Sequence, residues 1–308
     1  MSSRNKPTKA EVDQYLANTN WGRWGDKASA GALNLIDATK RLEAISLVSK
    51  GKMISMSRPL PVTPNGDNPR PAQHYMYKED RPYNGGAAFD YQGVFYHGTS
   101  TTHIDALCHV WNKDGMWEGK NPEEIIQFNG ASFGTIDEWK DGILTRGVLL
   151  DVPKFRNTDY VTIESPVHGW ELEDIAASQN ITIKPGDAVF VYSGREKYAK
   201  NNEGIWLGNK GMTSARPGLH ASCLPFIKDN DISILGWDMM DASPNEYEVP
   251  WTVHGAIFAY GIALIDNALL EPLSKVCREE NKYEFMVTIN PLYVVGGTGS
   301  PANPIAIF

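Results

Sequence analysis

The stretch HGTSTTHIDALCH, residues 97–109, decides how the rest of the chain is interpreted. It holds three of the seven histidines of the chain. Side chains of a strand alternate between two faces, so an extended backbone here places His97, His103 and Asp105 on one face, together with Thr99 and Thr101. Burying such a face costs free energy unless an opposite charge compensates it. Histidine and aspartate are common ligands of divalent metals, and the pattern therefore predicts a metal site.

The spacing within the stretch suggests different roles for its residues. His103 and Asp105 lie two residues apart and can bind one metal ion, and a turn after Ala106 can bring His109 back toward it. The alternative is a strand-end histidine bonded to backbone, with Asp105 capping the next turn. Three histidines and an aspartate in register favour the metal site. On the same alternation Cys108 points away from Asp105, which favours a packed cysteine over a nucleophile.

The composition of the 308-residue chain is typical of a soluble globular protein, with 42% hydrophobic and 21% charged residues. A net charge of −8 argues against nucleic acid as a partner, because phosphate binding needs a basic surface. No apolar run approaches the roughly 20 residues of a membrane span, and residues 1–11 lack an apolar signal core. Three widely spaced cysteines fit a reducing compartment, so we expect a cytoplasmic protein without disulfides.

Helical and strand patterns follow one another without a clear linker, which predicts a single mixed α/β domain. Helices are expected over residues 8–17, 37–50, 170–178, 218–230 and 252–260. Strands are expected over residues 53–60, 89–105, 147–152, 188–192, 232–236, 262–265 and 283–290. Residues 61–90 are rich in Pro, Gly, Asn and Tyr and predict a surface loop near the site. Residues 296–299, Gly-Gly-Thr-Gly, predict a loop at the C-terminus.

Further candidate site residues lie near the ends of predicted strands. His254 starts a short helix, and Asp266 ends an apolar strand, where strand ends commonly open into a cleft. The alternative for Asp266 is a cap of the turn that follows. Asp238 and Asp241 follow another buried strand and are either partners of the ligands or turn residues. Arg216 precedes a helix and fits equally well in the cleft or in a surface ion pair.

The chain lacks the glycine-rich motifs of dinucleotide-binding proteins and of P-loop proteins. It also lacks the Gly-x-Ser-x-Gly turn of the α/β-hydrolases. Ser193-Gly194 follows a predicted strand, but it lacks that turn context. The histidine-rich stretch therefore stays the best candidate for chemistry.

Residues 102–109, THIDALCH, resemble the His-x-Gly-Thr-His-x-Asp-x-Pro-x-His signature of the cyclase family, which includes bacterial kynurenine formamidases and isatin hydrolases. Further matching stretches follow in the expected order over residues 24–34, 185–189, 217–219, 235–238, 254–255 and 261–266. The resemblance implies a compact α/β domain of the swivelling β/β/α type, a β-barrel-like mixed sheet flanked by helices, here over residues 51–308. Residues 1–50 are then an N-terminal helical arm, and the expected assembly is a homodimer or homotetramer.

The resemblance also implies roles for single residues, with a divalent metal, Mn or Zn, as cofactor. His103 and Asp105 fall on metal ligands, and His109 falls on the histidine that acts as general acid and base. His254 falls on a histidine at or near the metal, and Asp266 falls where the family commonly has a glutamate.

One departure from the family pattern matters. The first ligand histidine of the family falls on Thr99, and His97 lies two residues earlier, where a bulge could let it substitute. Without that substitution the site loses a nitrogen ligand, which favours one metal ion over two, or a changed chemistry. The shorter carboxylate of Asp266 points the same way.

We therefore predict a metal-dependent hydrolase that cleaves a cyclic or N-acyl amide of a small molecule with an apolar or aromatic part. The alternatives are a lactonase or a cyclase/dehydratase on the same metal, or a small-molecule-binding protein with altered catalysis. The loop 61–90 and Trp111 are candidates for an apolar substrate wall, although Trp111 and Trp117 are equally compatible with ordinary packing.

Overall fold

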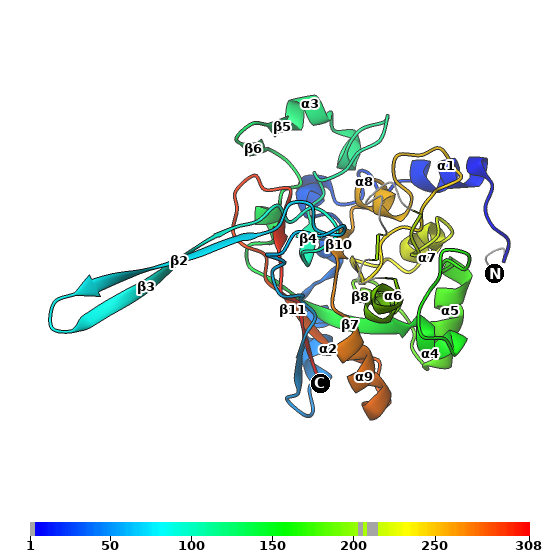
Figure 1. Ribbon diagram of the computed structural model, residues 1–308. Coiled ribbons are helices and arrows are strands. Elements are labelled where there is room, and N and C mark those ends of the chain that lie inside the picture. The colour runs from blue at the N-terminus through cyan, green and yellow to red at the C-terminus, as the bar shows by residue number, and fades with distance from the viewer. Residues whose placement is uncertain (1–3, 203–205, 208–214) are drawn as a thin grey trace.

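One nine-stranded sheet forms the centre of the protein in the computed structural model, which describes residues 4–202, 206–207 and 215–308. The strand order is β1-β13-β11-β7-β8-β9-β10-β4-β12, with both parallel and antiparallel neighbours. The sheet curls into a half-barrel, and helices flank it (Figure 1). This architecture confirms the predicted α/β fold with a barrel-like mixed sheet.

The elements have the following bounds. The strands of the large sheet are β1 Met53–Ser55, β4 His103–Asp105, β7 Ile143–Asp151, β8 Ala188–Tyr192, β9 Ile234–Trp237, β10 Ala263–Asp266, β11 Glu284–Ile289, β12 Gly299–Pro301 and β13 Ile305–Ile307. Two hairpins lie outside it, β2 Gln73–Arg81 with β3 Gly85–Gly93, and β5 Ile126–Gln127 with β6 Gly130–Ala131. The α-helices are α1 Lys9–Ala17, α2 Ala38–Ser46, α3 Pro122–Ile125, α4 Val152–Arg156, α5 Gly169–Ser178, α6 Arg195–Asn201, α7 Cys223–Asp229, α8 Ala256–Tyr260 and α9 Glu271–Glu280. Short 3₁₀ helices are η1 Gly25–Leu35, η2 Trp117–Gly119, η3 Ile136–Trp139 and η5 Val253–Gly255.

The four parallel strands β7, β8, β9 and β10 form the buried core of the sheet. The last three are fully buried and apolar except for Asp266 at the end of β10, as expected for parallel strands that are covered on both faces. The short strand β4 extends this core in the antiparallel direction and pairs with β10 on one side and β12 on the other. Its register places His103 opposite Asp266, so two predicted site residues meet across neighbouring strands.

Several segments differ from the sequence-based expectation, and the strand predicted over 53–60 and the helix predicted over 218–230 are shorter than expected. Residues 89–105 are not one strand, because β3 ends at Gly93 and β4 begins only at His103. Gly98 between them has a φ of 153°, which interrupts the strict alternation on which the prediction rested. Residues 61–90 contain a long hairpin strand rather than an irregular loop. Residues 299–301 form β12 instead of a loop, because they pair with β4.

The first two helices begin where the sequence predicts. Thr8 caps α1 through a reciprocal arrangement with Glu11, and the Asp37 side chain accepts a hydrogen bond from the backbone of α2. α2 ends at Ser46, before the predicted stop at Gly51. α2 packs on β7 and β11, so it covers part of the sheet. The division at residues 50 and 51 stays a prediction.

A buried ion cluster fastens α2 to the sheet. The carboxylate of Asp187, just before β8, lies 2.5 Å from Nζ of Lys40 and 2.8 Å from Nη1 of Arg146. The three side chains are at most 7% exposed. Glu43 and Glu284, which are partly exposed, also contact Lys40 and Arg146, so Asp187 is the carboxylate that the two buried cations share. Removing a buried partner of this kind is costly.

We expect Asp187→Ala to lower the free energy of unfolding by about 3–5 kcal/mol, because it removes the only fully buried carboxylate of the cluster and leaves Lys40 and Arg146 paired only with the partly exposed Glu43 and Glu284. Urea unfolding followed by circular dichroism measures this. The control is Asp114→Ala, which removes an exposed partner of Lys113 and should change the free energy by less than about 0.5 kcal/mol. Equal effects of the two substitutions would contradict a role for the cluster in anchoring α2.

Candidate metal centre

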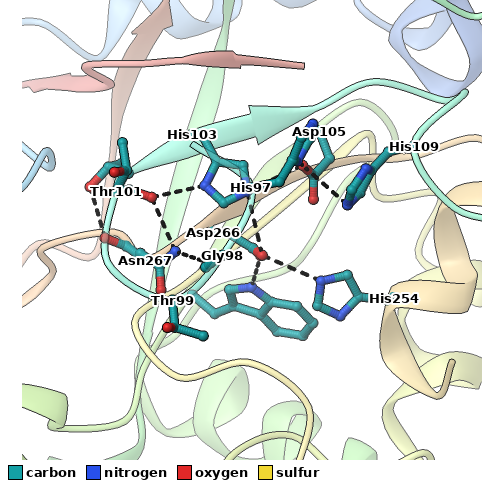
Figure 2. Close-up of polar contacts among 12 residues, drawn as sticks. His97, Gly98, Thr99, Thr101, His103, Asp105, His109, His254, Asp266 and Asn267 are labelled. Carbon is teal, nitrogen blue, oxygen red and sulfur yellow. Dashed lines mark hydrogen bonds and ion pairs between the residues drawn. The ribbon is translucent and has the colours of Figure 1, made fainter. Parts of the chain in front are cut away.

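The carboxylate of Asp105 is the centre of the candidate site. It is completely buried on β4, and neither of its oxygens accepts a hydrogen bond from any residue that the structure describes. Three imidazole nitrogens face Oδ1 instead, at 3.0 Å for His97 Nδ1, 3.3 Å for His103 Nε2 and 3.9 Å for His109 Nε2 (Figure 2). Such a carboxylate is costly in a protein interior unless positive charge lies close to it.

Asp266, at the end of β10, supplies a second carboxylate to the same cluster. Its Oδ2 lies 3.8 Å from His103 Nε2 and 3.3 Å from His254 Nε2, and its Oδ1 accepts a hydrogen bond from Trp237 Nε1. Figure 2 shows His103 and His254 pointing toward Asp266 from opposite sides. The cluster therefore continues from Asp105 through His103 to Asp266 and His254.

Two groups of residues have the donor atoms for a metal ion, and they share Asp105. The first group is His97, Asp105 and His109, and the second is His103, Asp105 and Asp266. Within each group the donor atoms lie within 4.8 Å of one another. His254 borders the second group through Asp266. The structure thus brings together all six residues singled out in the sequence.

Hydrogen bonds fix the orientation of three imidazoles. Nδ1 of His103 donates to the carbonyl of Thr101 at 2.8 Å, which aims Nε2 at the two carboxylates. His254 Nδ1 bonds to Asp241, and His97 Nε2 lies 2.9 Å from Thr298 Oγ1. Partners of this kind orient metal-binding histidines and tune their basicity.

The electrostatics of the cluster separate His103 from His109. Burial opposes a charge on His103, but the carboxylates of Asp105 and Asp266 outweigh burial and raise its pKa to about 9. Burial lowers the pKa of His109 to about 4, only partly offset by Asp105. Burial would raise the pKa of Asp105, but His109 and His103 hold it well below its ordinary value. The protein therefore stabilises positive charge between Asp105 and Asp266.

A buried arginine shapes the loop that carries Thr99. Arg195 Nη1 donates to Asn267 Oδ1 at 2.7 Å, and its Nη2 donates to the carbonyl of Thr99 at 2.5 Å. Asn267 Nδ2 in turn donates to the carbonyls of Gly98 and Thr101, at 2.8 and 3.0 Å. We call Arg195 and Asn267 the loop clamp. Sequence reasoning missed both residues, although each follows the end of a buried strand, which is a usable signal.

The clamped loop directs Thr99 away from the cluster. Thr99 Oγ1 donates to the carbonyl of Asp67 at 2.6 Å, so its hydroxyl is bonded outside the cluster. The backbone turn at Gly98 brings His97 toward Asp105 in its place. The predicted substitution of His97 for the residue missing at Thr99 is therefore compatible with the geometry, although it arises from a turn and not from a strand bulge.

The structure also shows where the other candidate residues from the sequence analysis lie. The side chain of Asp241 bonds to His254, which is a candidate ligand. The backbone carbonyl of Asp241 accepts a hydrogen bond from Arg216 Nε. Asp238 accepts hydrogen bonds from the three backbone N–H groups that follow β8, apart from the cluster. Burial raises the pKa of the Cys108 thiol to about 12, which fits a packed cysteine. Trp117 is fully buried and Trp111 is 43% exposed, so only Trp111 can contact a ligand.

The family model described as "Putative cyclase" matches residues 36–244, and the chain therefore belongs to the cyclase family. The matched region contains β4 and the stretch 97–109, and it ends before His254 and Asp266. A comparison with functionally curated proteins found no significant match. Among the described residues, no helix has the length and apolar character to cross a membrane.

Solved structures share the fold over most of the chain. A crystal structure of a novel cyclase is 27% identical with a TM-score of 0.84, covering 96% of this chain and 99% of that one. Isatin hydrolase A from Labrenzia aggregata bound to benzyl benzoate is 18% identical with a TM-score of 0.58, covering 86% and 97%. Isatin hydrolase A from Ralstonia solanacearum is 14% identical with a TM-score of 0.55, covering 83% and 91%. At these identities the two isatin hydrolases show a common fold.

We expect Asp241→Asn to weaken binding of Zn²⁺ by about 10- to 100-fold, because it removes the carboxylate that orients His254. Competition with a chromophoric chelator measures the affinity. The control Asp231→Asn removes an exposed partner of Arg23 far from the cluster and should leave the affinity unchanged. Unaltered Zn²⁺ affinity in both variants would exclude His254 from metal binding.

Proposed function

We propose that this protein is a metal-dependent hydrolase that opens a cyclic or N-acyl amide of a small molecule. The observation that carries the proposal is the buried carboxylate of Asp105, which faces three imidazole nitrogens and accepts no hydrogen bond from the described residues. Membership of the cyclase family supports it.

The donor set fits a divalent cation such as Zn²⁺ or Mn²⁺. Imidazole nitrogens and carboxylate oxygens are the ligands that these ions prefer in proteins. His103, Asp105 and Asp266 would hold the ion, with His254 at the edge of the site. His97, whose Nδ1 lies 3.0 Å from Asp105 Oδ1, is the further ligand that we propose. When bound, such an ion lowers the pKa of a water molecule and polarises a substrate carbonyl.

His109 is placed to move the proton of the reaction. Its side chain is 23% exposed. Solvent and substrate can therefore reach His109 and its neighbour His97, which are the partly exposed members of the Asp105 cluster. Its ring stacks on His97 at 3.8 Å between centroids, which fixes its plane. We assign it to accept a proton from the attacking water and to donate it to the leaving nitrogen. Asp105, 3.9 Å from Nε2, stabilises the imidazolium in between.

Two exposed aromatic rings border the histidines along the chain. Phe95 is 69% exposed two residues before His97, and Trp111 is 43% exposed two residues after His109. An amide substrate with an apolar or aromatic part can contact these rings while its carbonyl lies at the cluster. This supports a substrate of the type predicted from the sequence.

Two substitutions separate the proposed acid–base role of His109 from metal binding. We expect His109→Ala to reduce kcat by about 10²- to 10⁴-fold while Zn²⁺ stays bound. His103→Ala should instead lose the metal together with activity, because His103 faces both carboxylates. The assay uses formanilides, isatin-like lactams and lactones, with and without Mn²⁺ or Zn²⁺, and elemental analysis gives the metal content. Turnover of lactones alone would favour the lactonase alternative, and tight binding without turnover would favour a binding protein.

The proposed replacement of the missing ligand by His97 has its own test. We expect His97→Ala to weaken Zn²⁺ binding by at least about 10-fold, because a nitrogen next to Asp105 is lost. The matched control is Thr99→Ser, which keeps the hydroxyl that bonds to Asp67 and should bind Zn²⁺ like the wild type. Isothermal titration with Zn²⁺ compares the two variants. Unchanged binding by His97→Ala would show that the cluster holds its metal without this residue.

A further inference from the structure

Two adjoining cavities lead from the histidine cluster toward the base of the β2–β3 hairpin. The inner cavity has a volume of about 90 Å³, and His97 is part of its lining. The outer cavity has a volume of about 650 Å³, and its lining residues are mostly apolar or aromatic, with Tyr75 and Tyr91 among them. Arg70 and Phe95 line both cavities, so they lie where the two meet. We call the two cavities together the groove.

The groove has the size and character of a site for a small aromatic molecule. Small-molecule sites commonly have volumes of about 300–1,000 Å³ and mostly apolar walls. Phe95 is 69% exposed and precedes His97 by two residues, which span at most about 7 Å of chain. A substrate whose carbonyl lies at the histidine cluster can therefore place an aromatic ring beside Phe95.

Arg70 supplies a positive charge at the same point of the groove. Its guanidinium carbon lies 5.2 Å from the centroid of the Phe95 ring, a cation–π contact that holds the planar group in place. The residue is exposed, and the guanidinium forms no ion pair or hydrogen bond with any residue that the structure describes. Its N–H donors are therefore available to a ligand in the groove.

The one acidic side chain among the described lining residues has other partners. Asp67 lines the inner cavity, but its two carboxylate oxygens accept hydrogen bonds from the backbone N–H groups of Leu207 and Trp206, at 2.9 and 3.0 Å. These bonds stabilise the charge of Asp67 without Arg70. Arg70 is therefore left as an uncompensated cation beside an aromatic ring.

We propose that Arg70 binds a carboxylate of the substrate, so that the preferred substrates are aromatic amides that carry a carboxylate on the ring. The planar fork of a guanidinium matches the two oxygens of a carboxylate, and an ammonium group does not. The net charge of the chain is −8, so an anion approaching the site gains from an unpaired cation in the groove. This substrate class refines the proposed function and rests on it, whereas the binding of a carboxylate at Arg70 does not.

Matched substrates test the preference. Formanilides with a carboxylate on the ring are compared with the corresponding carboxamides, which have nearly the same shape and no charge, and release of formate is measured with Mn²⁺ or Zn²⁺. The wild type should show a kcat/KM at least about 10-fold higher for the carboxylates. Arg70→Gln should abolish this preference and change kcat/KM for the carboxamides by less than about 2-fold.

The matched control is Arg41→Gln, which removes an exposed arginine of α2 and should keep the full preference. It corrects for the change in net charge, which is the same in both variants. An active wild type without a preference for carboxylates would overturn the inference. The same preference in Arg70→Gln as in the wild type would also overturn it.

A conservative substitution and salt distinguish an ion pair from a packing effect. Arg70→Lys keeps the charge and loses the planar fork, so it should retain part of the preference. Raising NaCl from about 0.05 to about 0.5 M should reduce the preference of the wild type, because salt screens exposed charges. If lysine retains none of the preference and salt leaves the wild type unchanged, the effect comes from the packing of Arg70 on Phe95, and the inference fails.

Ligand binding without turnover separates the carboxylate site from the proposed function. Isothermal titration compares benzoate with benzamide in the purified wild type, in Arg70→Gln and in Arg41→Gln. Benzoate should bind at least about 10-fold more tightly than benzamide in the wild type and in Arg41→Gln, and the difference should vanish in Arg70→Gln. If this result is obtained and no amide is hydrolysed, the proposed function fails and the carboxylate site stands. If amides are hydrolysed and Arg70→Gln binds benzoate like the wild type, the hydrolase stands and the inference is refuted.

Discussion

The buried carboxylate of Asp105 is the constraint around which the site is arranged. It lies on β4, the strand between β10 and the edge strand β12, and it is completely buried, so water cannot solvate it. The chain offers it imidazole nitrogens instead of N–H donors from the backbone. An arrangement with this much acid and so few donors is stable only with positive charge in the middle. The neighbouring residues are therefore arranged to surround a cation rather than to form hydrogen bonds with one another.

That placement is achieved by contacts from separate parts of the chain. The Thr101 carbonyl orients His103, Asp241 orients His254, and Trp237 fixes one oxygen of Asp266. The loop clamp of Arg195 and Asn267 sets the path of the backbone before β4. Each contact leaves the metal-facing atom of a ligand free, which is the condition for a site that binds an ion rather than collapsing into internal ion pairs.

Local sequence patterns predict the parts of the structure that depend on local rules. The apolar runs of β8, β9 and β10 identify the buried core, and the spacing of His103 and Asp105 identifies two neighbours in the cluster. The approach of His97 follows from a turn at Gly98 that the alternation of a strand does not describe. Other features depend on contacts between distant segments, namely the pairing of β12 with β4 and the hydrogen bond of Arg195 to the loop before β4. The β2–β3 hairpin is largely exposed, so it leaves no pattern of buried residues in the sequence. A single sequence carries too little information on such pairings to predict them.

The position of β4 in the sheet has a consequence for the order in which the protein matures. His103 and Asp105 lie about one third of the way along the chain, but the strands on either side of β4 begin at residues 263 and 299. The contact between His97 and Thr298 closes a separation of 201 residues. Chain closure over such distances is slow, so these contacts form late in folding. A nascent chain on the ribosome therefore exposes histidines and an aspartate without their native surroundings, and the finished site is assembled only after nearly the whole chain has been released.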